Sequence, residues 1–179
     1  MDYSTDFMTH AETIVHLFTK TFSDSEGEEE GKLIGALVRR LIAETPEKDL
    51  RTFTGWKGTT LLGCICFSRL VYDNVSRSVF MMSPVAITPE YQRKGLGKKL
   101  ISHRLRELKM QGIDILVTYG DPSFYNRVGF TSVSQHTLPP PHALQQPEGW
   151  IAQSLNGAPI TQLRGPSSCV SAFNDPALW

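Results

Sequence analysis

A short run with two glycines, between residues 91 and 100, carries the clearest chemistry in the chain. An extended apolar segment, residues 83–90, leads into this run, and an amphipathic helix follows it. The predicted order is strand, glycine-rich turn and helix N-terminus, which directs backbone N–H groups and the positive end of a helix dipole toward one point. Gly95 and Gly97 lack a Cβ atom, so the turn can adopt unusual φ values and an anion can approach the backbone closely. The run is therefore predicted to bind an anion such as a phosphate.

The helix after the turn is predicted to bury one face and to expose its cations. Arg93 in the turn, with Lys98 and Lys99 at the helix start, lies nearest the anion site and could neutralise a bound phosphate. Most other cations of the helix are expected on a solvated face; they are Arg104, Arg106 and Lys109. The apolar positions have helical spacing and are expected in the core; they are Leu96, Leu100, Ile101, Leu105 and Leu108.

The strand before the turn contains a proline. Pro84 has no N–H group to donate to a neighbouring strand, so it marks a bulge or a place where pairing stops. If pairing stops there, Val85, Ala86 and Ile87 offer free backbone N–H and C=O groups. An extended ligand with amide groups could pair with this segment as an added strand. The ligand is therefore expected to extend along the strand, beyond its phosphates.

The remaining segments supply the elements around this site. Two amphipathic helices precede three strands, of which the second and third form an antiparallel hairpin through a turn at residues 73–76. A buried strand follows the anion-site helix, and that crossover helix makes the flanking strands parallel neighbours. The predicted helices cover residues 7–22, 28–43 and 123–127, with a further helix that Gly112 ends, and the predicted strands cover residues 51–57, 60–73, 77–88, 113–119 and 150–155, with one resuming at Phe130. Residues 135–149 are expected to be irregular, and residues 156–179 are not assigned.

An acidic stretch separates the two N-terminal helices. Residues 23–30 are interpreted mainly as a solvated turn whose carboxylates complement the dipole of the second helix. One or two of Glu28, Glu29 and Glu30 could instead attract a cationic substrate, and both interpretations stay open.

Composition limits the classes of function. The chain has 179 residues, enough for one domain with a real core, and its 18 Lys and Arg balance its 18 Asp and Glu. Because the net charge is zero, nothing global is expected to recruit nucleic acid or an acidic membrane surface. The N-terminus lacks the basic and apolar regions of a signal peptide, and the apolar run Leu61–Phe67 is too short to span a bilayer. A cytoplasmic protein is expected.

The cysteines are expected to be structural. Cys64 and Cys66 lie two apart in a predicted strand and therefore share one face. No further Cys or His lies nearby in the sequence, so we expect buried, inert thiols and no metal site.

Two motifs in the right order resemble the signatures of a known family. The first is Gln/Arg-x-x-Gly-x-Gly/Ala after a strand of Leu/Val-x-Val type, and the second is Tyr-x-x-x-Gly-Phe. The matching residues are Gln92, Gly95 and Gly97, preceded by Val85, Ala86 and Ile87, and then Tyr125, Gly129 and Phe130. Over about residues 3–132 the chain thus resembles the GNAT superfamily of acetyl-CoA-dependent N-acetyltransferases, and in particular its small single-domain bacterial members.

The resemblance implies an α/β (α+β) fold. Its centre would be a mixed, mostly antiparallel, twisted sheet of six or seven strands flanked by helices, in which the fourth and fifth strands are parallel and splayed to form the CoA cleft. Residues 1–179 would form a single acetyltransferase domain, with an irregular extension over residues 133–179 that holds one further strand. The implied partners are acetyl-CoA as cosubstrate and an amine acceptor, without metal, nucleic acid or membrane. A monomer or a homodimer is expected.

The resemblance also implies roles for individual residues. Backbone amides of the turn would hold the CoA pyrophosphate, the segment from Val85 to Ile87 would pair with the pantetheine arm, and the Ile87 N–H would polarise the thioester carbonyl. Tyr125 would protonate the departing thiolate. The implied CoA-binding residues also include Gln92, Arg93, Lys94, Gly95, Leu96, Gly97 and Lys98, with Ser123 and Asn126 as minor contacts.

The base and the acceptor stay open. A lysine-like amine titrates near ~10.4, so a base or a water chain must remove its proton before attack. Candidates for the base are Glu28, Glu29, Glu30 and Glu90, with Tyr72 and His142 as weaker ones. A protein lysine, a polyamine, an aminoglycoside or an amino acid would suit the motifs as acceptor.

Two other classes of function are weighed. A non-catalytic acyl-CoA-binding sensor or partner module would share the anion site, although it would have no need of the Tyr125 hydroxyl. A P-loop nucleotide enzyme is excluded because the sequence contains no Gly-x-x-x-x-Gly-Lys-Ser/Thr.

Overall fold

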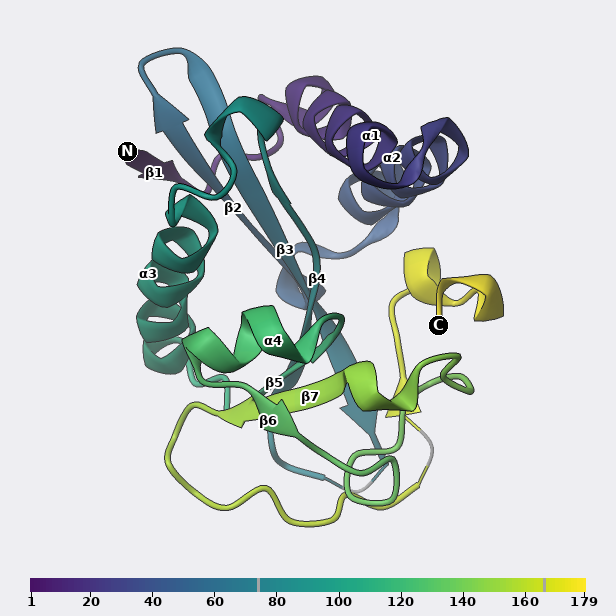
Figure 1. The fold of residues 1–179 in the computed structure, drawn as a ribbon. Coiled ribbons are helices and arrows are strands. Elements are labelled where there is room, and N and C mark those ends of the chain that lie inside the picture. Colours follow the sequence, from purple (N-terminus) through teal and green to yellow (C-terminus); the bar gives the residue numbers. More distant parts are fainter. Residues whose placement is uncertain (74, 166) are drawn as a thin grey trace. The chain divides into compact units, whose positions relative to one another are not determined.

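The strands form an open mixed sheet in a computed structural model, which describes residues 1–73, 75–165 and 167–179 (Figure 1). Hydrogen-bonded strands follow the order β1-β2-β3-β4-β5-β7-β6, and the two-residue β8 pairs with β3 beside this path. The strands are β1 Asp2–Ser4, β2 Leu50–Lys57, β3 Thr60–Tyr72, β4 Val79–Ile87, β5 Ile115–Tyr119, β6 Thr131–Ser132, β7 Trp150–Ser154 and β8 Ser167–Ser168. The α/β class predicted from the sequence is confirmed, with β8 added to the six or seven strands expected.

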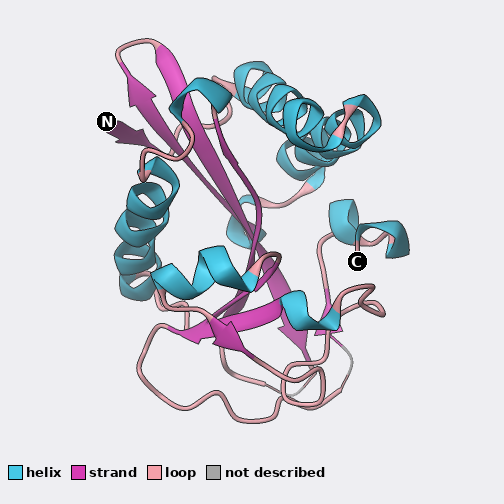
Figure 2. Ribbon diagram, in the orientation of Figure 1, coloured by secondary structure: helices cyan, strands magenta, loops and turns pink. Residues whose placement is uncertain are grey.

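Helices separate several of the strands along the chain (Figure 2). The α-helices are α1 Ala11–Glu26, α2 Glu28–Glu44, α3 Leu96–Met110 and α4 Pro122–Tyr125. Short 3-10 turns lie at Pro89–Tyr91, before α3, and at Asn126–Val128, after α4. No helix in the described ranges is long and apolar enough to cross a membrane.

The chain divides into two compact units. The first unit comprises Met1–Phe67 and Pro84–Ile101, and the second comprises Ser68–Ser83 and Ser102–Trp179. The strands β3 and β4 and the helix α3 contribute residues to both units. A single functional domain over residues 1–179 stays a prediction.

In the first unit, the acidic stretch between α1 and α2 is helical rather than a turn. Ser25 donates its hydroxyl to the Thr21 carbonyl (3.1 Å), and α1 continues to Glu26. The break falls on Gly27, whose φ of 104° is one that L-residues rarely adopt. The three following glutamates form the first turn of α2, where they complement its dipole. The helix predicted over residues 28–43 is confirmed as α2, whereas the predicted turn before it is corrected, because among residues 23–27 only Gly27 lies outside a helix.

The parallel pairing of β4 with β5 ends early. Its register runs from Val79 opposite Ile115 to Met81 opposite Val117, whereas β4 continues to Ile87. Pro84 lies beyond the last of these pairs, which agrees with the prediction that pairing stops near the proline. The turn predicted at residues 73–76 includes Asn74, which lies outside the described residues.

Burial confirms most of the predicted core and corrects one cation. Cys64 and Cys66 are both free and 0% exposed, as expected. Arg104, predicted on a solvated face, is instead 3% exposed and forms an ion pair with Glu107. Residues four apart lie on the same face of a helix, so Arg104 shares the buried face of Leu100 and Leu108. Two of the predicted core leucines of α3, Leu96 and Leu105, are only half-buried.

The C-terminal segment of the second unit packs through aromatic residues. The strand β7 pairs with β5 from Trp150 opposite Tyr119 to Ser154 opposite Ile115, and residues 135–149 are irregular apart from a 3-10 turn, as expected. Trp179 is 2% exposed, its Nε1 donates to the Phe173 carbonyl (2.9 Å), and its ring centroid lies 6.1 Å from that of Trp150. Phe173 and Trp179, from the stretch unassigned from the sequence, thus contribute to the core of this unit.

Candidate functional site

The glycine-rich turn before α3 uses left-handed backbone at two positions. Gly95 has a φ of 75° and Arg93 has a φ of 57°. A Cβ on Gly95 would meet nothing within 4 Å, so the backbone angle, and not space, calls for glycine there. Gly97 lies inside α3 without a left-handed φ, so the expectation of unusual φ values holds for Gly95 and is corrected for Gly97. Sequence reasoning missed the strained conformation of Arg93, because non-glycine residues seldom adopt it.

The backbone amides of this turn are free. In the described part of the chain, the amides of residues 93–98 donate no hydrogen bond, whereas the Gln92 amide donates to the Pro89 carbonyl (3.2 Å) and the Lys99 amide to the Gly95 carbonyl (3.1 Å). The first N–H groups of any α-helix lack an intrahelical acceptor, and the preceding turn here adds more of them. Consecutive free amides at the positive end of a helix dipole form an anion site.

Cationic residues lie within and beside this run of amides in the sequence. Arg93, Lys98 and Lys99 are exposed, so their charges can reach an anion bound at the helix start. Lys94 is engaged elsewhere, because its Nζ donates to the Glu90 carbonyl (2.8 Å) and lies 5.1 Å from the centre of the Tyr91 ring. The positive charge at this turn is therefore a local feature of a chain whose net charge is zero.

The segment between β4 and the turn is tied to β3. Thr88 donates its amide to the Leu62 carbonyl (2.9 Å) and its hydroxyl to the Leu61 carbonyl (2.8 Å). A 3-10 turn over Pro89–Tyr91 follows, in which the Tyr91 amide donates to the Thr88 carbonyl (2.8 Å). Sequence reasoning did not single out Thr88, since its partners lie on another strand.

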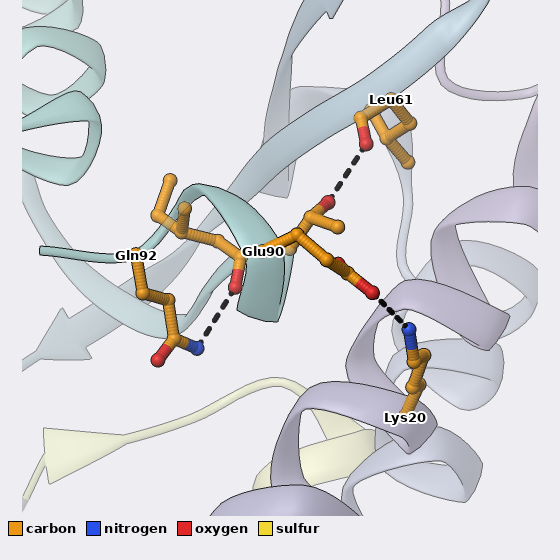
Figure 3. Close-up of polar contacts among 6 residues, drawn as sticks. Lys20, Leu61, Glu90 and Gln92 are labelled. Carbon is orange, nitrogen blue, oxygen red and sulfur yellow. Dashed lines mark hydrogen bonds and ion pairs between the residues drawn. The ribbon is translucent and has the colours of Figure 1, made fainter. Parts of the chain in front are cut away.

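The side chains of Gln92 and Glu90 make further contacts that hold this segment in place (Figure 3). Gln92 turns back and donates Nε2 to the Ile87 carbonyl (3.0 Å). Glu90 pairs with Lys20 of α1 (2.8 Å), and this hydrogen bond lowers the pKa of the Glu90 carboxyl. The Gln92 side chain therefore contacts the protein backbone in this structure, whereas the sequence assigned it to CoA binding.

In the second unit, the Tyr125 hydroxyl is held in its protonated form. Burial raises the pKa of Tyr125, with a smaller contribution from the Asp121 carboxylate, and the Thr118 hydroxyl opposes the shift. The Tyr125 ring packs edge-on against Phe124 and Phe130, with centroids at 5.0 and 5.9 Å. A Cβ on Gly120 would lie 2.9 Å from a ring carbon of Tyr125, so glycine leaves room for the ring.

The residues around Tyr125 order the short helix. Asp121 caps α4 by accepting hydrogen bonds from the Ser123 amide (2.8 Å) and hydroxyl (2.7 Å). Ser123 and Asn126 are exposed, which leaves both accessible to a ligand. Gly129 ends the following 3-10 turn with a φ of 96°, which agrees with the sequence prediction of a helix-ending glycine.

The base candidates have different surroundings. Glu29 pairs with Lys32 (2.7 Å), and this hydrogen bond lowers the pKa of Glu29. Tyr72 is 5% exposed, and burial raises its pKa to about 12, which makes it a poor base near neutral pH. His142 contacts Asn174 of the C-terminal segment (3.0 Å). These contacts favour neither Glu90 nor Glu29 as a base, because each carboxylate is already held by a lysine.

The site residues predicted from the sequence fall into two groups. Residues 85–98 belong to the first unit, where the strand end, the free amides and the cations lie on one continuous segment. Ser123, Tyr125 and Asn126 belong to the second unit, on one short helical segment. Each group is ordered internally by its own hydrogen bonds.

The sequence and the fold match known acetyltransferases. A family model described as an acetyltransferase (GNAT) domain matches residues 48–132. The uncharacterised N-acetyltransferase YjhQ of Escherichia coli (strain K12) is 27% identical over 173 residues, covering 94% of this chain and 91% of its own. The crystal structure of the GNAT N-acetyltransferase YhbS of Escherichia coli in complex with CoA has a TM-score of 0.76 and 21% identity, covering 97% of this chain and 92% of its own.

A second solved structure agrees in fold. The GNAT acetyltransferase of Brucella melitensis in complex with acetyl-CoA has a TM-score of 0.68 and 21% identity, and the comparison covers 97% of each chain. Both of these structurally similar proteins were solved with CoA or acetyl-CoA bound.

Proposed function

Because the chain belongs to the GNAT superfamily of acetyltransferases, we propose that it moves the acetyl group of acetyl-CoA directly to a primary amine of a small molecule or a protein. The observation that carries this proposal is the run of free amides at residues 93–98, at the N-terminus of α3. A pyrophosphate presents several acceptor oxygens and negative charge, which is what such a run binds best.

The phosphate end of acetyl-CoA is held by the backbone of the turn. The amides of Arg93, Lys94, Gly95, Leu96, Gly97 and Lys98 donate to the pyrophosphate, and the exposed Arg93, Lys98 and Lys99 add opposite charge. Ser123 and Asn126 are minor contacts.

The pantetheine arm pairs with the end of β4. Thr88 donates its amide to β3, and backbone groups of successive residues in a strand point to opposite edges, so the Ile87 N–H is directed away from β3. Val85 presents its groups to the same edge, beyond the last residue of β4 that pairs with β5. The pairing of β4 with β3 thus supports Ile87 as the donor that polarises the thioester carbonyl.

The reaction is a direct transfer through a tetrahedral intermediate. The nitrogen of the neutral amine attacks the thioester carbon, and the Ile87 N–H stabilises the oxyanion, an interaction worth roughly 3 kcal/mol for one donor. The C–S bond then breaks, Tyr125 gives its proton to the departing thiolate, and the proton of the amine goes to a base or a water chain. The raised pKa of Tyr125 keeps its hydroxyl protonated until this step.

Replacing the proposed acid tests the mechanism. In Tyr125→Phe, CoA release with a panel of primary amines is expected to fall about a hundredfold or more, the range for a lost general acid. Affinity for CoA, measured by calorimetry, should stay close to that of the wild type, because the phosphate-binding amides are untouched. Tyr3→Phe, which removes a hydroxyl from β1, is the matched control and should keep full turnover.

Two outcomes would contradict the proposal. Full activity of Tyr125→Phe would show that another group protonates the thiolate. Saturable binding of acetyl-CoA by the wild type, without consumption across polyamines, aminoglycosides, amino acids and lysine peptides, would favour a non-catalytic acyl-CoA-binding module.

A further inference from the structure

We propose that Thr88 and Gln92 are positioning residues that fix where the acyl end of CoA lies along β4; this inference rests on the proposed function. Ile87 and the free amides of residues 93–98 would hold the two ends of one ligand. The segment of residues 88–92 joins them within the first unit and so sets their spacing. A ligand held at both ends reacts well only if this spacing matches its own length.

Thr88 holds the inner edge of the segment. Its amide and its hydroxyl donate to two successive carbonyls of β3, those of Leu62 and Leu61. The bond from the hydroxyl is partly buried and joins residues far apart in the sequence, so water replaces it less easily than an exposed bond. This double attachment keeps the chain on β3 just after β4 ends, and thereby fixes the direction of the preceding Ile87 N–H.

Gln92 acts at the outer edge. Its Nε2 donates to the Ile87 carbonyl (Figure 3). The carbonyl and the N–H of one strand residue point to the same edge, so this bond lies on the side of the Ile87 N–H. With this carbonyl already bonded to Gln92, an added strand can use the Ile87 N–H, whereas continued pairing to the Ile87 carbonyl must compete with the Gln92 side chain. Gln92 therefore disfavours pairing beyond the Ile87 N–H and favours one register of the pantetheine arm.

The remaining contacts make this segment stiff. Pro89 begins the 3-10 turn with a fixed φ, and the Gln92 amide closes the turn on the Pro89 carbonyl. The Lys94 Nζ donates to the Glu90 carbonyl and links this turn to the phosphate-binding amides. Loss of Thr88 or Gln92 should therefore displace the thioester from Ile87 while the phosphates stay bound.

The test observes the thioester carbonyl itself and needs no acceptor amine. Acetyl-CoA labelled with carbon-13 at the acetyl carbonyl is bound to the wild type and to Thr88→Val, Gln92→Met and Thr88→Ser. A hydrogen bond from Ile87 shifts the carbonyl resonance downfield from its position in free acetyl-CoA. Thr60→Val and Gln162→Met, both at exposed positions, remove the same chemical groups elsewhere and serve as controls.

We expect Thr88→Val and Gln92→Met to lose most of the wild-type downfield shift while their Kd for CoA stays within about threefold. Thr88→Ser keeps the hydroxyl and should restore the shift, and both controls should retain it. Wild-type shifts in both Thr88→Val and Gln92→Met would overturn the inference, as would equal losses in the controls. If Thr88→Val does not fold, the exposed Gln92→Met decides alone.

The wild type separates this inference from the proposed function. Failure of the wild type to bind acetyl-CoA, or binding without a downfield shift, would overturn the proposed function and this inference with it. A downfield shift in the wild type that survives in the two variants would overturn the inference alone.

Discussion

The two glycines of the motif at the start of α3 have different conformational requirements. Gly95 has a left-handed φ of 75°, which costs an L-residue roughly 1–2 kcal/mol. Gly97 is the second residue of α3 and has helical backbone, where alanine is the better residue for stability. The spacing of the motif alone does not distinguish the two positions, because it reports only that both side chains are absent.

We therefore expect Gly95→Ala to lower the free energy of unfolding by about 1–2 kcal/mol, because its methyl group forces a strained φ. Gly97→Ala is the matched control and should leave the stability of the ligand-free protein unchanged or raise it by up to about 1 kcal/mol. Urea unfolding of both variants without ligand checks this. Equal losses in the two variants would show that backbone strain at Gly95 is not the cause.

Residue-level prediction is least informative where a role depends on contacts distant in the sequence. The resemblance implies that Gln92 binds CoA, which stays a prediction, and the structure adds that its side chain donates to the Ile87 carbonyl. Nothing in the local sequence marks Thr88, because its acceptors lie on β3. The charge of Arg104 predicts a solvated position, whereas its helical register with Leu100 places it on the buried face. The spacing of Arg104 from Leu100 can be read from the sequence, whereas the hydrogen-bond partner of Thr88 cannot.

At the scale of elements, α1 and α2 approach each other closely through glycines. A Cβ on Gly31 would lie 2.6 Å from the Thr19 carbonyl oxygen and 2.8 Å from the Ser23 amide nitrogen, both of them backbone atoms. A Cβ on Gly35 would lie 2.1 Å from the Thr19 hydroxyl oxygen but 3.8 Å from the Thr19 Cα. The helices could be predicted from apolar spacing, but their separation could not, because it depends on which faces meet.

These contacts predict unequal effects of the same substitution. Gly31→Ala should destabilise the protein by about 1–3 kcal/mol, since backbone atoms of α1 must move to make room. Gly35→Ala should cost clearly less, because a side chain can rotate away and alanine improves helix propensity by about 1 kcal/mol. Urea unfolding at pH 7 compares them. A larger loss in Gly35→Ala would contradict the packing described.

The strand β4 was largely predictable, for a reason particular to proline. Pro84 has no backbone N–H to donate, so the proline alone indicates where pairing with a neighbouring strand ends. The register of β4 with β5, which ends at Met81, agrees with this. The hydrogen bonds of Thr88 to β3, just after the strand, could not be predicted, because a threonine before a proline does not indicate its hydrogen-bond partners.

At the scale of the whole molecule, the class of fold could be predicted because two motifs fix the order of strand, helix and strand. The C-terminal residues could not be placed in the same way. Trp150, Phe173 and Trp179 come together from distant positions in a segment rich in proline and glycine, with little periodic pattern. Short strands such as β8 depend on a partner, here the end of β3, and leave almost no local trace.

The response of the molecule to alkaline pH should depend on a buried tyrosine at the end of β3. Burial raises the pKa of Tyr72 to about 12. Within the described residues, the Tyr72 hydroxyl has no hydrogen-bond partner. Below pH ~10 the folded and the unfolded chain both keep the proton, so Tyr72 has no effect on the pH dependence of stability there. Above it, the unfolded chain loses the proton first, so stability falls until the pH passes the folded-state pKa.

Tyr72→Phe should remove this alkaline loss. Between pH ~10 and ~12 the wild type should lose up to about 2–3 kcal/mol of unfolding free energy through Tyr72, and the variant should lose less by that amount. At pH 7 the variant should be as stable as the wild type or more stable, because it removes a buried hydroxyl without a partner. Urea unfolding across this pH range measures both effects. Parallel declines in the two proteins would mean that Tyr72 already ionises in the folded state near its ordinary pKa, and a loss of stability at pH 7 would mean that its hydroxyl has a partner after all.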